Sequence, residues 1–154
     1  METTLNIIVK GDKILLARKK RGFGAEKINS PGGKLEPGET IEQAMIRETQ
    51  EEVGITPTVY EYVGVVTYDE YFKGQKTIFD CHLFLTTGWQ GEPTESDEMK
   101  PMWISKNEIP YAEMFGDDPY WLPQVLAGEK VKCFFKFDKD FKIIEYKVEN
   151  LIRK

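Results

Sequence analysis

The chain has 154 residues and a formal net charge of −5, and 40% of its residues are hydrophobic. This length suits one ordinary domain, and the composition excludes an intrinsically disordered protein. No run approaches the ~20 apolar residues of a membrane span, the first residues lack the features of a signal peptide, and the acidic balance disfavours a nucleic acid polymer as a partner. We therefore expect one soluble, cytoplasmic domain over residues 1–154 that is a monomer and binds no membrane.

The rarity of cysteine and histidine restricts the chemistry. Cys81 and Cys133 lie far apart in apolar runs and form no CxxC pair, so we interpret them as buried reduced thiols, with a disulfide or a nucleophile as alternatives. The single histidine, His82, lies in the apolar run FDCHLFL and is interpreted as a strand residue. A His-rich zinc site is therefore excluded, and a Ser or Cys nucleophile with a histidine base would have to use His82.

Two short apolar runs, residues 4–10 and 13–18, open the chain, and the dipeptide Gly11-Asp12 between them is typical of a hairpin turn. The following residues, 19–33, are rich in glycine and basic side chains. This segment is too irregular for a strand or a helix, and loops of this kind usually carry function. We expect two paired strands followed by a functional loop.

A helix is predicted to begin at Thr40 and to end at Gly54. The sequence T-I-E-Q is a capping box, in which the side chains of Thr40 and Gln43 each accept a hydrogen bond from the backbone of the other residue. Glycine is the usual residue just after a helix. The apolar stripe of this helix consists of Ile41, Met45, Ile46 and Val53.

The rest of the chain alternates strands with turns and one further helix. The second helix is predicted to begin at Asp117-Asp118-Pro119 and to end at Gly128, with strain at Pro123. A capping box over 105–108 predicts a brief turn. Two strands, 58–66 and 76–86, are expected to form a hairpin around the turn 73–75. A single short strand is expected at 101–105, and the strands 130–137 and 141–148 are expected to form a second hairpin around 138–140. Together these elements predict an α/β domain with a mixed sheet and two principal helices.

Three glutamates of the first helix, Glu48, Glu51 and Glu52, project from one face because they stand three and four residues apart. Such a face can simply be solvated. Here the only basic residue among them is Arg47, which can pair with Glu51, and the helix follows a Gly-rich turn that a phosphate could approach. Crowded carboxylates attract divalent cations, and Mg²⁺ commonly bridges protein carboxylates and substrate phosphates. The cluster therefore indicates a metal site for phosphate chemistry, and it lacks the ligand spacing of an EF-hand.

The segment GGKLEPGETIEQAMIRETQEEVGI resembles the signature of the Nudix family. One departure is Thr49, where the family prefers an aliphatic residue that faces the core. The resemblance implies the Nudix fold, an α/β/α sandwich with a mixed β-sheet. The matching positions are Gly33, Glu39, Arg47, Glu48, Glu51, Glu52, Gly54 and Ile55.

The same resemblance implies an enzyme that hydrolyses a nucleoside diphosphate linked to another moiety, with Mg²⁺ or Mn²⁺ as the cofactor. By position, the metal ligands would be the carboxylates of Glu48, Glu51 and Glu52 and the backbone carbonyl of Gly32. A metal ion neutralises the phosphates and lowers the pKa of a bound water, so this hydrolysis needs no histidine. The general base would be a glutamate of this cluster, Glu48 or Glu52, or one from a distant loop.

Over nearly its whole length, the chain is similar to the MutT-homologue branch of the family. Enzymes of this branch remove oxidised purine nucleoside triphosphates such as 8-oxo-dGTP. The similarity is carried by KKRGFGAEKINSPGGK, WQGEPTESDEMKPMW and FGDDPYWLP. In this branch the positions of Asn29, Asp117 and Asp118 read the purine edge, and that of Glu98 is a further metal-site or catalytic glutamate. Two adjacent carboxylates in a closed pocket resist ionising together, so one can donate a hydrogen bond while the other accepts. Alternatively, Asp118 is only a helix N-cap.

Other side chains of these segments are candidates for substrate contacts. Phe23 and Phe115 would stack on the base or merely pack their loops, and Lys19 and Arg21 would meet phosphates or only solvate the loop. The MutT-homologue branch differs from this chain near the expected base site, where it has tryptophan in place of Ile28 and Phe115 and Gly-Phe in place of Ser30-Pro31. These departures imply a pocket of different shape.

The expected activity is Mg²⁺-dependent hydrolysis of purine nucleoside triphosphates to the monophosphate and pyrophosphate, as in sanitation of the nucleotide pool. The preferred base stays open among 8-oxo-dGTP, 2-hydroxy-dATP, methylated purines and ordinary dGTP. One alternative is a Nudix enzyme for a dinucleoside polyphosphate or a nucleotide sugar. Another is a nucleotide-binding module without catalysis, which would normally have lost a glutamate of the signature; none is lost.

Overall fold

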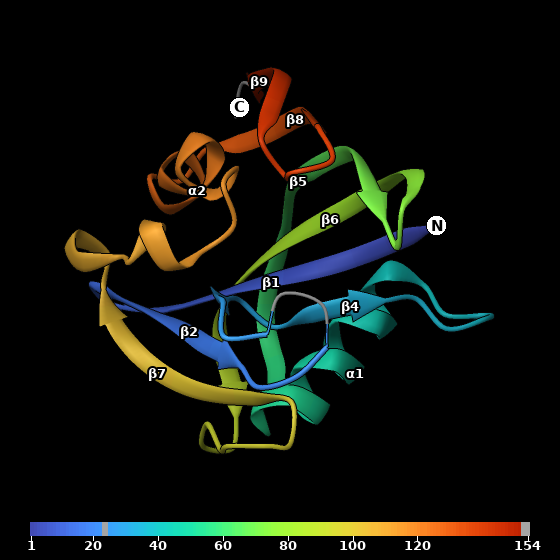
Figure 1. Ribbon diagram of the computed structural model, residues 1–154. Coiled ribbons are helices and arrows are strands. Elements are labelled where there is room, and N and C mark those ends of the chain that lie inside the picture. The colour runs from blue at the N-terminus through green and yellow to red at the C-terminus, as the bar shows by residue number, and fades with distance from the viewer. Residues whose placement is uncertain (23–24, 152–154) are drawn as a thin grey trace.

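The computed structural model describes residues 1–22 and 25–151, which form one mixed sheet flanked by helices (Figure 1). The strand order is β3-β2-β1-β6-β5-β8-β9, with β4 paired to β1 and β7 paired to β2. The pairs β1–β6 and β5–β8 are parallel and the others antiparallel. The strands are β1 (Glu2–Lys10), β2 (Lys13–Lys19), β3 (Ile28–Asn29), β4 (Gly32–Lys34), β5 (Thr56–Phe72), β6 (Gln75–Gln90), β7 (Met99–Ser105), β8 (Lys130–Phe137) and β9 (Ile143–Leu151).

The first helix, α1 (Ile41–Val53), has the caps that its sequence predicts. The Thr40 side chain accepts from the Gln43 N–H, and the Gln43 side chain accepts from the Thr40 N–H. Gly54 follows in the left-handed conformation with φ 75°, which glycine adopts without a Cβ penalty. Within the described residues, no helix is both long enough and apolar enough to span a membrane.

The two main helices, α1 and α2 (Asp118–Leu126), cover opposite faces of the sheet. Successive side chains of a strand point to opposite faces, and the neighbours Ile7 and Ile8 of β1 accordingly enter two different core clusters. The cluster with Ile7 includes Trp121 of α2, whereas the cluster with Ile8 includes Val53 of α1. The α/β/α sandwich expected from the Nudix resemblance is confirmed.

The segment 19–33 was expected to contain no strand, and this expectation is wrong. Residues 28–29 pair with β2 as β3, and β4 (Gly32–Lys34) pairs with β1. These strands have only two and three residues, which is too short to show a hydrophobic alternation. Their hydrogen-bond partners lie in β2 and β1, so no local pattern of the segment predicts them. The pairing brings the segment that precedes α1 against the sheet.

The central hairpin is longer than the ranges 58–66 and 76–86 predict. β5 and β6 continue to a two-residue turn at Lys73-Gly74, where both residues have positive φ, as a tight hairpin requires. Three register irregularities in the first part of β5 disturb its alternation. The extension adds the residues near the turn to the sheet, and two of them line the cavity described below.

The remaining elements lie close to their expected places. The short strand at 101–105 begins two residues earlier, as β7, and the last strand, β9, is shifted toward the C-terminus. Ser105 caps the 3₁₀ turn Lys106–Glu108 through the Asn107 N–H, and a second 3₁₀ turn spans Tyr111–Glu113. Pro123 lies inside α2 without ending it.

Thr49 occupies the core-facing position of α1 where an aliphatic residue is usual, and it is 1% exposed. Its hydroxyl donates to the Met45 carbonyl at 2.8 Å and accepts from the Asn6 side chain at 3.0 Å. Asn6 in turn accepts from the Thr86 hydroxyl at 2.6 Å. Hydrogen bonding removes most of the cost of burying these polar groups, and the chain of bonds ties α1 to β1 and β6.

Replacing Thr49 with valine is expected to lower the free energy of unfolding by about 1–3 kcal/mol, because the Asn6 amide is left buried without its acceptor. Urea unfolding followed by circular dichroism measures this change. Serine at position 49 keeps the hydroxyl and loses only a methyl group, so it is the matched control. Equal losses in the two variants would contradict a role for the hydroxyl.

Candidate active site

The glutamates of α1 are organised around Arg47. Its guanidinium donates to both carboxylate oxygens of Glu39 at 2.7 and 2.9 Å, to Glu48 at 2.7 Å and to Glu51 at 3.2 Å. The pairing lowers the pKa of Glu39 to about 2 and raises the pKa of Arg47. The expected Arg47–Glu51 pair is therefore present, within a wider network that fixes the side of α1 next to β4.

Two glutamates face the glycines that precede α1. The Gly32 N–H donates to Glu52 Oε1 at 2.8 Å, and a Cβ on Gly33 would lie 2.6 Å from the carboxyl carbon of Glu48. A side chain at position 33 would therefore collide with the Glu48 carboxylate. Burial is the main cause that raises the pKa of Glu48, and it raises the pKa of Glu52 to about 8. Buried carboxylates with raised pKa values are groups that a divalent cation would stabilise in their charged form.

Glu51 and Glu98 lie farther toward solvent. Glu51 is paired with Arg47, and its side chain is 58% exposed. Glu98 accepts two hydrogen bonds from Arg21, at 2.8 and 3.0 Å. Its loop is held to the end of α1 by Ser96, whose hydroxyl donates to the Glu52 carbonyl at 2.7 Å and accepts from the Glu98 N–H at 3.2 Å. Arg21 was a candidate for phosphate contact, and here its partner is Glu98.

A cavity of about 500 Å³ brings together most of the residues predicted from the sequence. The described candidates Lys19, Asn29, Phe115, Asp117 and Asp118 all line it, and so do Gly32 and Glu52. Glu48, Glu51 and Glu98 are not part of its wall, and Phe23 lies outside the described residues. One space therefore joins the carboxylate end of α1 with the paired aspartates at the start of α2.

The two aspartates are nearly inaccessible, at 2% and 3% exposure, and their partners differ. Oδ2 of Asp117 accepts from the Tyr68 hydroxyl at 2.6 Å and from the Trp121 indole N–H at 2.8 Å. Among the residues that the structure describes, Oδ2 of Asp118 accepts only from the Phe115 N–H, at 3.0 Å. Burial raises both pKa values, and the charge of Asp117 raises that of Asp118 further. Two donors favour the anion at Asp117, so we expect a proton of the pair to reside on Asp118.

The alternative prediction, that Asp118 is the N-cap of α2, is wrong. Asp117 occupies the N-cap position without a side-chain cap hydrogen bond, and Asp118 is the first residue of the helix. The Asp118 carboxylate instead accepts from the backbone of Phe115, three residues earlier. Both carboxylates are therefore available to the cavity rather than used to cap the helix.

Two residues of β5 in the cavity wall were not singled out from the sequence. Tyr68 and Glu70 stand two positions apart, so they point to the same face of the sheet. Burial and the Asp117 charge raise the pKa of Glu70 to about 7 and that of Tyr68 well above its ordinary value. Their only sequence signal is the alternation of β5, which had been expected to end at residue 66.

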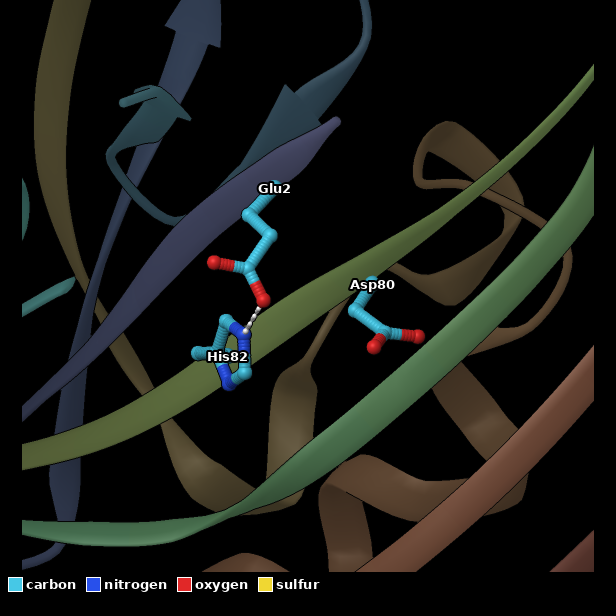
Figure 2. Close-up of side chains that lie close together, drawn as sticks. All are labelled: Glu2, Asp80 and His82. Carbon is cyan, nitrogen blue, oxygen red and sulfur yellow. Dashed lines mark hydrogen bonds and ion pairs between the residues drawn. The ribbon is translucent and has the colours of Figure 1, made fainter. Parts of the chain in front are cut away.

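The single histidine lies in β6, as expected. His82 Nε2 is 3.1 Å from Glu2 Oε1, and its Nδ1 is 2.8 Å from the Tyr62 hydroxyl. Figure 2 shows Glu2 and His82 facing each other with Asp80 beside them. The three residues offer ligand atoms within 4.8 Å of one another, but none of them lines the cavity. Both cysteines are free and buried, as the sequence predicts.

Comparison with known proteins gives the family. The NUDIX domain profile matches residues 2–125. The chain belongs to the Nudix family. Its relatives include oxidized purine nucleoside triphosphate hydrolases of Danio rerio, 40% identical, and of Mus musculus, 38% identical, each over 96% of this chain and 94% of the relative. A solved structure of a MutT protein from Bacillus halodurans has a TM-score of 0.84 at 30% identity, over 96% of this chain and 97% of that one.

This Nudix protein is a pyrophosphohydrolase related to oxidised purine nucleoside triphosphate hydrolases, and its substrate is a nucleotide. Nudix enzymes typically use divalent metal ions. The residues of this chain fit such an ion, because the half-buried Glu48 and the buried Glu52 lie on one side of α1 and burial raises the pKa of both, a cost that a bound cation would offset. The carboxylates of α1 and the Gly32 carbonyl are hard oxygen ligands of the kind that Mg²⁺ prefers.

Proposed function

We propose that this chain hydrolyses purine nucleoside triphosphates, including oxidised ones such as 8-oxo-dGTP, to the nucleoside monophosphate and pyrophosphate in the cytoplasmic nucleotide pool. The supporting observation is that one cavity is lined by Asn29, Asp117 and Asp118 together with Glu52 of the Nudix signature and Gly32 next to it. A nucleotide bound there would have its base near the aspartates and its phosphates near α1. The relatives of Danio rerio and Mus musculus are oxidized purine nucleoside triphosphate hydrolases, and this substrate class agrees with the proposal.

At the phosphate end, Glu48, Glu51, Glu52 and the Gly32 carbonyl would hold Mg²⁺, or Mn²⁺ in its place, with Glu98 as a further ligand. The bound ion would neutralise phosphate charge and make a coordinated water more acidic. A glutamate from this set, Glu48, Glu52 or Glu98, would accept the proton of the attacking water. Lys19, which lines the cavity, would bring a positive charge to the phosphates.

At the base end, the ionised Asp117 would accept and the protonated Asp118 would donate a hydrogen bond. The Watson–Crick edge of guanine has an acceptor, O6, next to the donors N1–H and N2–H. The donor Asp118 and the acceptor Asp117 are therefore complementary to this edge. Asn29 has its Oδ1 engaged by the Ser30 N–H at 2.9 Å, which fixes the amide and leaves its NH₂ group as a donor. Phe115 would cover the base with its ring.

The direct test is release of pyrophosphate and monophosphate from 8-oxo-dGTP and from dGTP at matched concentrations with Mg²⁺. Preferential cleavage of 8-oxo-dGTP, lost when the metal is chelated, is the expected result. Cleavage of neither nucleotide would contradict the proposal and direct attention to dinucleoside polyphosphates and nucleotide sugars. Release of single phosphates instead of pyrophosphate would contradict the proposed bond cleavage.

A further inference from the structure

Glu70 places a third acid in the cavity that also holds Asp117 and Asp118. Within the described chain its carboxylate makes no hydrogen bond and no ion pair. An acid that is partly buried without a partner is unfavourable, and a bound ligand that supplies a donor would relieve this cost. Glu70 can therefore accept a hydrogen bond from a donor group of the substrate.

The position of Glu70 relative to Asp117 suggests which part of a base it meets. Tyr68 links the two, because its hydroxyl contacts Asp117 and its backbone lies two residues before Glu70 on the same strand. Two residues of a strand span about 6.6 Å. A purine that presents its Watson–Crick edge to Asp117 and extends past Tyr68 would turn its five-membered ring toward Glu70. The rings of Tyr68 and Phe79, 5.4 Å apart, form the adjoining wall.

Oxidation at C8 changes the chemistry of this ring edge. In ordinary guanine, N7 is a hydrogen-bond acceptor, whereas in 8-oxoguanine N7 carries a hydrogen and becomes a donor. We propose that Glu70 selects oxidised purines by accepting a hydrogen bond from N7–H; this inference rests on the function proposed above. An ionised Glu70 would repel the N7 lone pair of dGTP, while a protonated Glu70 would donate to it and lose the discrimination.

The protonation of Glu70 responds to pH in the neutral range. Burial, followed by the nearby charge of Asp117, raises its pKa to about 7. Its cross-strand neighbour on β6 is Thr77, which is uncharged. The other titratable groups around the cavity are Lys19, Lys27, Glu52, Cys81, Tyr68 and the aspartate pair. These groups act equally on oxidised and ordinary guanine nucleotides, since the two share their phosphates and their Watson–Crick edge, so a ratio of the two substrates isolates Glu70.

The test is the ratio of kcat/KM for 8-oxo-dGTP to kcat/KM for dGTP between pH 6 and pH 8. In the wild-type protein we expect the ratio to rise about tenfold as Glu70 ionises, the effect of about 1.4 kcal/mol that one hydrogen bond supplies. In Glu70→Gln the ratio should be low and independent of pH, because the amide neither ionises nor repels N7. Glu145→Gln removes an exposed carboxylate outside the cavity and should behave as the wild type.

A wild-type ratio that does not change with pH, or a pH-dependent ratio that survives in Glu70→Gln, would overturn this inference. Calorimetric binding of 8-oxo-dGMP and dGMP at the same pH values gives the ratio without turnover. A pH-dependent binding ratio in a protein that releases no pyrophosphate would contradict the proposed function and support the role of Glu70. A flat binding ratio in an active enzyme would contradict only the role of Glu70.

Discussion

Glu52→Gln is expected to lower kcat/KM for nucleoside triphosphate hydrolysis by roughly 10³-fold, within the range for loss of a positioned acid–base group. Glutamine has the same shape, and its Oε1 can still accept from the Gly32 N–H. The variant therefore keeps the local geometry while it loses the negative charge that would bind the metal ion and the basic oxygen that would take a proton. Pyrophosphate release at saturating Mg²⁺ measures the loss.

The matched control is Glu42→Gln, an exposed glutamate in the first turn of the same helix whose carboxylate contacts only the Tyr60 hydroxyl among the described residues. Its turnover should stay close to the wild type. Thermal unfolding should show that Glu52→Gln remains folded, because the change removes a buried acid that is costly to ionise. Wild-type turnover in folded Glu52→Gln would exclude Glu52 from both proposed roles and leave Glu48 and Glu98 as the candidates.

The parts of the fold that could be predicted are those whose signals are local. Thr40, Gln43 and Gly54 lie within one helix length, and the caps they predict are present. By contrast, β3 forms because it pairs with β2, and β4 forms because it pairs with β1. No local sequence pattern predicts such pairing. The same reason explains the short range predicted for β5, whose last residues are supported by β6 and β8.

The candidate site divides in the same way. The glutamates of α1 were found because their spacing is a motif, and the aspartate pair because the segment FGDDPYWLP resembles that of the MutT-homologue branch. The bond between Tyr68 and Asp117 joins residues 49 positions apart, and no spacing rule predicts it. The polar contact of Asn6 with Thr49 was missed for the same reason, since an Asn in an apolar run only acquires its partner when the helix packs on the sheet.

The second large effect is expected at Asp117. Asp117→Asn should lower kcat/KM by roughly 100-fold, because leaving a buried hydrogen-bonding group of the base without its partner costs about 1–3 kcal/mol. The asparagine oxygen can still accept from Tyr68 and Trp121, which turns its NH₂ group toward the cavity, where the anion had offered an acceptor. Removal of the Asp117 charge also removes one of the two causes that raise the pKa of Asp118, while burial, the larger cause, remains.

Asp118→Asn should be the milder change, with a loss within roughly tenfold. A protonated carboxyl and an amide both combine one acceptor with a donor, so the Phe115 N–H keeps its partner and the cavity keeps its donor. Steady-state kinetics of both variants, with the exposed Asp12→Asn as the control, measure the difference. A larger loss at Asp118 would mean that the proton resides on Asp117, and equal losses would contradict the assignment of different charge states to the two acids. The order of the two effects therefore reports the charge state of the pair, because each asparagine is neutral and mimics only the protonated acid.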